Sequence, residues 1–533
     1  MDAIFTSGIG YRTDMNRKAV LSAIGSGLLL TLAFPRADGY GLAWLALVPL
    51  LLSFRKATAA RGFSLGLIAG LSHYLTLLYW LVGTMTLYGQ LPAVVSVSLL
   101  VLLCFYLALY WAGFAYLCCR FWPRPTAGFL FFIPALWTAL EWIRTYLLSG
   151  FPWGCLGYSQ YQVLPLIQLA DLTGVYGVSF LIVMANAALF LLVMYWFRRD
   201  WQGNAVARKT AVFTGVAFLS AAVAAWTYGN HRIGFLEARM AGAAQKTISV
   251  IQGNIDQSVK WDPAFQAATV RKYLSLSRRA AAEKPDLIVW PETATPFYFL
   301  APHATKLTWL VQNGIRDIGT YFLIGSPSFI REIGRLEYYN SAYLMDPAGR
   351  PLQKYDKVHL VPYGEYVPLK KWFPFLGKLV AQVGDFRGGK KGATLHWSGN
   401  RLGVQICFEI IFPELSRSMA DNQADLLINI TNDAWFGKTG APYQHLSMAL
   451  FRAVENRRSL ARAANTGISG FIDPIGRITA ATALFEDAAL TRPMPLIRDK
   501  TVYSRFGDVF AAGCLAIVLL FLVWRYTKKG QTP

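Results

Sequence analysis

Apolar residues are distributed very unevenly along this 533-residue chain, and this distribution limits what the chain can fold into. Residues 1–230 consist mostly of long apolar runs, residues 231–505 have the mixed composition of a soluble domain, and residues 506–525 are apolar again. A bilayer core is crossed by roughly 20 apolar residues in helical form. The sequence therefore predicts a polytopic α-helical membrane bundle that carries a large extramembrane domain.

Eight apolar runs are candidate spans, seven before the soluble block and one after it. The first is short and follows Arg17 and Lys18, as the core of a signal peptide would. However, Phe34-Pro35-Arg36 comes after it in place of a small-residue cleavage site, so we expect a retained helix. The candidate spans are about residues 19–34, 40–54, 62–82, 92–118, 127–148, 172–197, 210–228 and 506–525.

The charge of the loops predicts the orientation of these spans. An even number of spans places both termini on one side, and the segments on that side carry fifteen Lys and Arg residues. The opposite short loops, near residues 35–39, 83–91 and 149–162, contain only Arg36. Cytoplasmic loops are the ones enriched in Lys and Arg. We therefore expect cytoplasmic termini and a block at residues 231–505 that lies outside the cytoplasm.

The net charge of +21 has the same explanation. Much of the basic excess lies in short loops beside apolar runs, where Lys and Arg set topology and meet anionic headgroups. A nucleic-acid-binding protein would carry a basic stripe on a soluble face. We expect membrane contact and no nucleic-acid partner.

Several polar residues fall at membrane depth. Glu141 and Arg144 are three residues apart on one predicted helix and are close enough to pair. His73 and Asp171 are the others. Intramembrane charges usually face a bundle interior or a cavity. The Glu141–Arg144 pair either fixes helix packing or touches the substrate directly.

The soluble block alternates short apolar strands with helices, which is typical of a layered α/β domain. Asp262-Pro263 resembles an N-cap followed by proline at the first helical position, and it opens a predicted helix to about residue 283. A second helix is predicted over about 443–464. The predicted strands are 247–251, 287–290, 321–325, 341–345, 403–407, 426–430 and 467–472.

One long loop, residues 362–392, contains many aromatic, glycine and lysine residues. Long loops without regular structure are often lids or binding loops. The aromatic side chains here, and those of Pro296–Leu300, either enter the lipid surface or pack against the domain core.

Three polar groups lie at the edges of predicted strands and form a possible catalytic set. Cys407 would be the nucleophile, and a thiol attacks a carbonyl only as thiolate. Glu292 is positioned to take the thiol proton, and Lys357 to stabilise the thiolate and an oxyanion. Glu365 and Glu409 are supporting carboxylates that hold Lys357 or relay protons. Cys407 is the only cysteine of its block, which argues against a disulfide.

These residues carry a resemblance to a known family. Trp290–Glu292, Tyr355–Glu365 and Cys407–Glu409 resemble the three signatures of the nitrilase, or carbon–nitrogen hydrolase, superfamily. With its membrane segments, the chain resembles the bacterial apolipoprotein N-acyltransferase family within it, over nearly its whole length. Supporting stretches are residues 151–154, 157–160, 174–180, 252–257, 260–261 and 432–437.

The resemblance implies an αββα-sandwich catalytic domain on an eight-helix bundle in the bacterial inner membrane. The implied domains are a seven-span bundle at 1–230, a periplasmic nitrilase-like domain at 231–505, and an eighth span with a cytoplasmic tail at 506–533.

The resemblance also implies a two-step reaction without metal or other cofactor. Cys407 would take the sn-1 acyl chain of a phospholipid, typically phosphatidylethanolamine, as a thioester. The α-amine of a diacylglyceryl-modified N-terminal cysteine on an apolipoprotein would then accept the chain. Glu292 would be the base and Lys357 the transition-state stabiliser.

Further positions match the family's functional residues. Glu365 matches another essential carboxylate, and Phe408 stands where the family often has tyrosine, so a hydroxyl is lost there. The other positions tied to activity or to substrate handling are Asn340, Glu409, Trp261 and Trp435.

Two alternatives remain open from the residues. A membrane-anchored amidase acting on a small amide would use the same three residues but would need only one anchor. A transporter with an inert external domain would function without Cys407.

Overall fold

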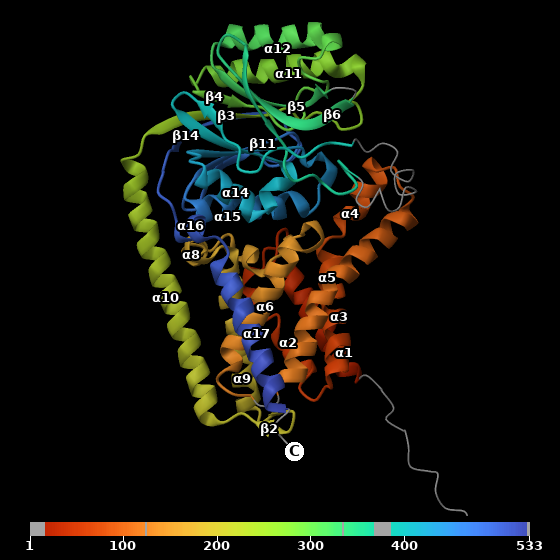
Figure 1. The fold of residues 1–533 in the computed structure, drawn as a ribbon, viewed down its shortest axis with the longest axis vertical. Coiled ribbons are helices and arrows are strands. Elements are labelled where there is room, and N and C mark those ends of the chain that lie inside the picture. Colours follow the sequence, from red (N-terminus) through yellow and green to blue (C-terminus); the bar gives the residue numbers. More distant parts are fainter. Residues whose placement is uncertain (1–15, 123–124, 333–334, 367–384, 530–533) are drawn as a thin grey trace, which may run out of the picture.

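The computed structural model describes residues 16–122, 125–332, 335–366 and 385–529. A layered α/β domain stands on a group of roughly parallel helices, and the long helix α10 runs along one side of the group (Figure 1). The helices of the lower part are α1 (Arg17–Leu32), α2 (Val48–Ser53), α3 (Ala59–Leu77), α4 (Trp80–Gly83), α5 (Ala93–Phe121), α6 (Phe129–Tyr146), α7 (Leu164–Ile167), α8 (Ala170–Thr173), α9 (Val175–Trp196), α10 (Arg208–Ala241) and α17 (Val509–Lys529).

Four of the described helices are long and apolar enough to cross a membrane, namely α5, α9, α10 and α17. A fifth span is formed if α3 and the segment Trp80–Tyr88, bent by 52° relative to it, count as one. The structure therefore supports several spans but does not establish all eight. The first two predicted runs form a 16-residue helix and the broken segment Tyr40–Ser53. At 1.5 Å per residue, 16 residues reach only about 24 Å.

The upper domain contains two six-stranded sheets. The first has the order β14-β3-β4-β5-β6-β7 and the second β13-β12-β11-β10-β9-β8, with parallel pairing at the centre of each. The strands are β3 (Gln245–Gln252), β4 (Leu287–Val289), β5 (Tyr321–Glu332), β6 (Arg335–Met345), β7 (Pro351–Asp356), β8 (Leu395–Trp397), β9 (Asn400–Ile406), β10 (Leu426–Thr431), β11 (Ser459–Ala464), β12 (Gly470–Ile472), β13 (Ile478–Ala481) and β14 (Ala488–Pro495).

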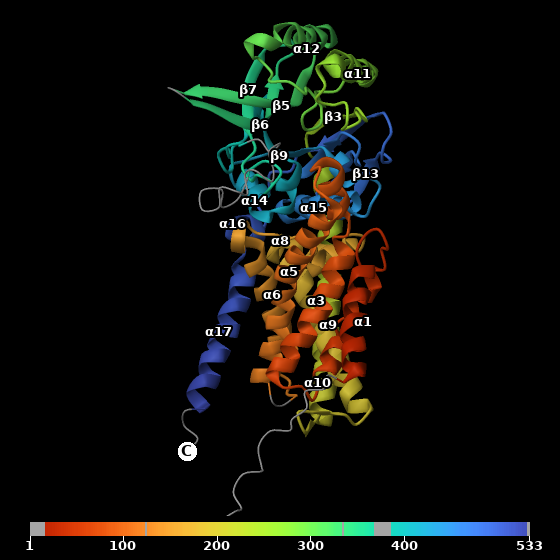
Figure 2. The ribbon, with the colours of Figure 1, turned by 90° about the vertical axis from the view of Figure 1, so that its right-hand side faces the viewer.

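The two sheets pack against each other, with β3 opposite β11 and β6 opposite β9. Helices α11 (Pro263–Ala281) and α12 (Thr305–Ile318) cover the outer face of the first sheet. Helices α14 (Pro413–Asp421) and α15 (Ala441–Asn456) lie between the second sheet and the membrane helices (Figures 1 and 2). The central strand β10 is buried along its whole length, as two-sided coverage requires. The expected αββα sandwich is confirmed.

The helix predicted over 443–464 is only partly correct. It ends after Asn456, and Arg457 adopts a left-handed conformation with φ of 49°. The next segment, Ser459–Ala464, is a fully buried strand that pairs with β10 and β12. The alanines of this segment have a high intrinsic helix propensity. The neighbouring strands β10 and β12 satisfy its main-chain hydrogen-bonding groups, so the segment forms a strand.

The two apolar loop segments have different outcomes. In Pro296–Leu300, Phe297 and Phe299 are buried, and the ring of Phe299 lies 5.2 Å from that of Tyr343. These aromatic residues therefore pack against the core and do not enter lipid. In the loop 362–392, residues 367–384 lie outside the described residues, so its membrane contact stays a prediction.

A buried polar cluster fastens the domain to the membrane helices. Asp171 on α8 accepts hydrogen bonds from Arg457 at 2.7 Å, Arg232 at 2.8 Å and the Tyr228 hydroxyl at 2.6 Å. Asp171 is 1% exposed, and Arg457 directly follows α15. Since α10 supplies Tyr228 and Arg232, three separate elements meet at one carboxylate. The expected domain boundary at residue 230 falls inside α10.

The expected pair of Glu141 and Arg144 does not form, because each binds a loop instead. Glu141 accepts the Leu156 N–H at 2.8 Å, and Arg144 donates to the Trp153 carbonyl oxygen at 2.7 Å. A buried loop must satisfy its main-chain polar groups, and these two side chains do so. Trp153 in turn donates to Gln444 on α15 at 2.7 Å. The two charges thus shape the surface on which the domain rests.

We expect Asp171→Ala to destabilise the protein strongly, because Arg457 would be left buried without its counter-charge. Removing one partner of a buried pair costs about 3–5 kcal/mol. The measurement is thermal unfolding of the purified protein in detergent. Asp421→Ala, which removes an exposed pair with Lys500, is the control and should change the midpoint little. Equal midpoints for the two variants would contradict the role of the cluster.

Candidate active site

Cys407 lies at a sharp turn where β9 ends. Its φ of +54° is a left-handed conformation that a residue with a side chain adopts only under constraint. The constraint comes partly from Glu409, whose carboxylate accepts the Ile406 N–H at 2.6 Å. The turn continues as the 3₁₀ segment η6 (Cys407–Ile411), and Cys407 is buried. This conformation turns the thiol out of the line of the strand.

Glu292 and Lys357 come from the other sheet. Glu292 follows β4 by three residues, and Lys357 directly follows β7. The Lys357 Nζ lies 3.6 Å from Glu292 Oε1 and 2.9 Å from Glu365 Oε2. Both Glu292 and Lys357 act electrostatically on the Cys407 thiol. The structure therefore brings the three predicted residues together between the two sheets.

Asn340 on β6 holds the two carboxylates in place. Its Nδ2 donates to Glu292 Oε1 and to Glu365 Oε1, both at 2.8 Å. The second oxygen of Glu292 accepts the Asn432 N–H at 2.9 Å. These partners are all donors, and they orient the Glu292 carboxylate. Such a group can serve as a base toward a neighbouring thiol.

The surroundings keep the thiol protonated at rest. Burial raises the pKa of Cys407, Glu292 raises it further, and Lys357 opposes them without reversing the shift. Burial alone would lower the pKa of Lys357, but Glu365 and Glu292 outweigh it and raise the pKa. Lys357 thus stays a cation, while Cys407 needs a base at the moment it reacts.

Glu409 supports the backbone of the site. Besides Ile406, it accepts the N–H groups of Val358 at 2.6 Å and His359 at 3.1 Å, and the Tyr355 hydroxyl at 3.1 Å. It therefore ties the segment after β7 to the turn after β9, across the two sheets. Burial raises the pKa of Glu409 to about 7, although these donors and Lys357 oppose the shift.

The predicted aromatic residues lie at the edge of this arrangement. Phe408 packs near Phe151 of the membrane part, with ring centres 6.4 Å apart. Trp435 is partly exposed, and its ring lies 5.2 Å from Tyr88 of the bent segment. Trp261 is half exposed. Among the described residues, no hydrogen bond or ring contact ties either indole to Cys407, Glu292 or Lys357.

Gly325 is a site residue that sequence reasoning missed. A Cβ atom at this position would lie 2.3 Å from the Pro291 carbonyl oxygen and 2.7 Å from the Glu292 Cα. Strand β5 thus passes against the main chain of Glu292 at this point, and only glycine leaves room. The glycine falls within a predicted strand, and nothing in the local sequence indicates which segment crosses it.

Asp433 and Arg462 form a second set that the sequence did not indicate. The Arg462 guanidinium lies 2.6 Å from Asp433 Oδ2, and both side chains are fully buried. Burial would raise the pKa of Asp433, but Arg462 and His445 outweigh it and lower the pKa. Arg462 therefore partly offsets the charge of Asp433, which still contributes to the raised pKa of the Cys407 thiol. Arg462 lies on β11, the strand that the sequence predicted as helix.

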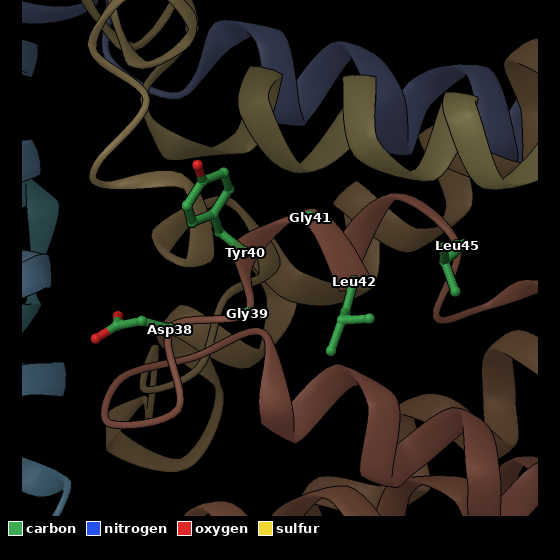
Figure 3. A pocket seen from close by; sticks show the side chains of 6 residues that line it. All are labelled: Asp38, Gly39, Tyr40, Gly41, Leu42 and Leu45. Atoms are coloured by element: carbon green, nitrogen blue, oxygen red, sulfur yellow. The ribbon is translucent and has the colours of Figure 1, made fainter.

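A shallow depression elsewhere does not overlap this site. It has a volume of about 410 Å³ and lies on the segment that precedes α2 (Figure 3). The lining residues are Asp38, Gly39, Tyr40, Gly41, Leu42 and Leu45. Since it contains none of the predicted site residues, we do not place the reaction there.

Comparison with known proteins gives matches to both parts of the chain. The family described as apolipoprotein N-acyltransferase N-terminal domain matches residues 26–188, and carbon-nitrogen hydrolase matches residues 247–496. A relative from Geobacter metallireducens, named apolipoprotein N-acyltransferase, is 46% identical and covers 96% of each chain. One of the same name from Pasteurella multocida is 32% identical, again over 96% of each.

Among solved structures, an amidase from Nesterenkonia sp. covers 50% of this chain and 95% of its own, with 21% identity and a TM-score of 0.37. This likeness is too weak to support a conclusion about the reaction.

We expect Gly325→Ala to lower the rate of any reaction at Cys407 about 100-fold, because the new Cβ would displace Glu292 from the thiol. Pre-steady-state formation of a covalent adduct at Cys407 measures this rate. Gly234→Ala, at a helical glycine with open space around it, is the matched control. A normal rate in Gly325→Ala would show that the position of Glu292 tolerates the shift.

We expect Glu409→Gln to weaken both stability and reactivity. The amide keeps one acceptor oxygen where the carboxylate has two, so at least one buried N–H loses its partner. An unsatisfied buried donor costs about 1–3 kcal/mol. Thermal unfolding and the rate of adduct formation at Cys407 report the two effects. Glu414→Gln is the control, because the Glu414 Oε2 has no hydrogen-bond partner.

Proposed function

This chain belongs to the apolipoprotein N-acyltransferase family, and we propose that it transfers an acyl chain from a phospholipid to the N-terminal cysteine of bacterial lipoproteins. The acceptor would be the α-amine of the S-diacylglyceryl-modified cysteine. The observation that carries the proposal is the position of the buried thiol, which lies beside an oriented carboxylate and a buried ammonium in a domain fastened to apolar helices.

In the first step, Glu292 takes the proton of Cys407 as the sulfur attacks the ester carbonyl of the donor. The S–C bond forms, the ester C–O bond breaks, and the proton passes from Glu292 to the alkoxide oxygen of the lysophospholipid. Lys357 stabilises the negative charge that develops on the way. The raised pKa of Cys407 makes the base necessary, because little thiolate exists at rest.

In the second step, the α-amine of the acceptor attacks the thioester carbonyl. The N–C bond forms, the C–S bond breaks, Glu292 takes a proton from the amine, and that proton returns to the sulfur. The same carboxylate thus serves as base and acid in both half-reactions. Phosphatidylethanolamine is the donor we propose, and each step is complete without a metal or other cofactor.

The remaining predicted residues have supporting roles in this scheme. Asn340 orients Glu292 and Glu365, Glu365 holds Lys357, and Glu409 shapes the turn at Cys407. Phe408 lies where the domain meets the membrane part. We propose that the exposed rings of Trp261 and Trp435 contact the acyl donor or the acceptor.

The proposed setting is the bacterial inner membrane, with residues 1–230 and 506–533 forming eight spans and residues 231–505 in the periplasm. Four long apolar helices and the bent pair support this setting. So do exposed apolar side chains on the outer helices, such as Leu102 on α5, Val216 on α10 and Leu520 on α17. The basic residues of the loops on the same side as the termini support the cytoplasmic location of that side.

We expect the wild-type protein, incubated with phosphatidylethanolamine alone, to gain the mass of one acyl chain on Cys407. Addition of a diacylated lipopeptide should remove this mass and yield the triacylated product. Cys407→Ala should abolish both signals, because alanine has no nucleophile. Intact-mass and peptide mass spectrometry measure the two steps.

Cys514→Ala, which removes a buried cysteine in α17, is the matched control and should keep both signals. Release of free fatty acid, or of ammonia from an added small amide, without any acylated lipopeptide would instead favour a hydrolase. Full lipopeptide acylation by Cys407→Ala would refute the covalent scheme.

A further inference from the structure

The charges around Cys407 do not balance if only the three predicted residues and Glu365 are counted. Lys357 is the one cation among them, and it contacts two carboxylates, Glu292 and Glu365. Asp433 pairs separately with Arg462, and its charge also acts unfavourably on a thiolate at Cys407. The set therefore carries a net negative charge before the sulfur ionises. The thiolate, or the oxygen of a tetrahedral intermediate, would add another negative charge in a buried place, which is costly without a further cation.

A second ammonium lies beside this set. Lys260 is 1% exposed, and its Nζ donates to the Glu292 carbonyl oxygen at 3.3 Å. Among the described residues, that neutral oxygen is its only hydrogen-bond partner, and no carboxylate lies within 4 Å. Burying a lysine against one carbonyl oxygen is unfavourable, and a neutral donor would satisfy that oxygen equally well. We therefore infer that the positive charge of Lys260, and not only its hydrogen bond, has a role at this position.

The segment that carries Lys260 is held firmly at the site. Asn465 binds Ile255 in both directions, accepting its N–H at 2.9 Å and donating to its carbonyl oxygen at 2.8 Å. Asn432 donates its side-chain amide to Gln257 at 2.8 Å and its main-chain N–H to Glu292 at 2.9 Å. The segment and the base therefore share Asn432 as an anchor. This arrangement anchors the chain just before Lys260 to the residue that also binds Glu292.

We propose that Lys260 is the second cation of the active site, a positioning residue that acts through Glu292 and Cys407 and offsets the negative charge that builds up when the thiol is deprotonated. The proposal rests on the proposed function, since it concerns the same nucleophile. The role of Lys260 differs from the one proposed for the neighbouring residue Trp261. The charge of Lys357 is already balanced by the two carboxylates that it contacts. Lys260 supplies the additional positive charge.

The pH dependence follows from the groups that face Lys260. The ionisable groups acting on it are Glu292 and Cys407, which raise its pKa, but burial outweighs them and lowers the pKa to about 8. The ammonium is therefore present below about pH 8 and lost above it. The rate of acyl-enzyme formation should fall as the pH rises through this value. An arginine at this position stays charged over the whole range.

The test compares Lys260→Met and Lys260→Arg with wild type, and uses Lys246→Met as matched control. Lys246 is also partly buried, but it pairs with Asp286 away from the site. Two rates are measured from about pH 6 to about pH 10 in detergent, one for acyl-enzyme formation from phosphatidylethanolamine and one for alkylation of Cys407 by iodoacetamide. Peptide mass spectrometry assigns the alkylated cysteine.

We expect Lys260→Met to slow both rates about ten- to hundredfold near neutral pH, and to abolish the decline of acyl-enzyme formation near pH 8. Lys260→Arg should keep most of the rate and move the decline to higher pH, and Lys246→Met should behave as wild type. A Lys260→Met variant with the wild-type rate and pH profile would overturn the proposal. So would folded Lys260→Met and Lys260→Arg variants that lose equal activity, because packing alone would then explain the loss.

If Lys260→Met does not fold, the shift in Lys260→Arg decides by itself, and an unshifted decline overturns the proposal. The alkylation arm uses no lipid. A dependence of alkylation on Lys260 without any acyl-enzyme would therefore contradict the proposed function and leave this inference standing.

Discussion

The site depends on one buried contact, that of the Lys357 ammonium with the carboxylates of Glu292 and Glu365. A buried charge is tolerated only when it is paired and hydrogen-bonded, so these three side chains determine one another's positions. Through them the end of β4 and the end of β7 are held together. Glu409 then joins the end of β7 to the turn after β9. The proposed nucleophile and its proposed base thus come from different sheets of the sandwich.

The same sandwich is anchored to the membrane helices by its lower layer. Asp171 and Arg457 fasten the end of α15, and the loop held by Arg144 and Glu141 supports its beginning through Trp153. Because η6 lies above this layer, the turn at Cys407 is held at one position relative to the membrane helices. A reaction between two lipid-anchored substrates, as proposed, requires such a position, since neither substrate leaves the bilayer.

Much of this could be predicted from the sequence where the signal is local. Strand β4 is a continuous apolar run and β10 is mostly apolar, and the acidic, basic and thiol side chains follow strand ends in recognisable contexts. The prediction failed where the answer depends on distant neighbours. Ser459–Ala464 has helical composition but fills a gap between two strands, and Glu141 binds a loop rather than the cation one turn away. The apolar runs predicted eight spans, whereas the described residues contain four helices long and apolar enough to cross a membrane, or five with the bent pair.

The sequence by itself determined the division into apolar and soluble parts, the layered α/β class and the candidate reactive groups, because hydropathy and the residue types at strand ends are properties of short stretches of chain. Only the tertiary structure decided which charges meet. It showed that burial raises the pKa of Cys407, that Gly325 makes room for Glu292, and that Lys260 lies buried against the main chain of Glu292. Electrostatic energies depend on distance and burial, and neither quantity exists until segments far apart in the chain have packed together.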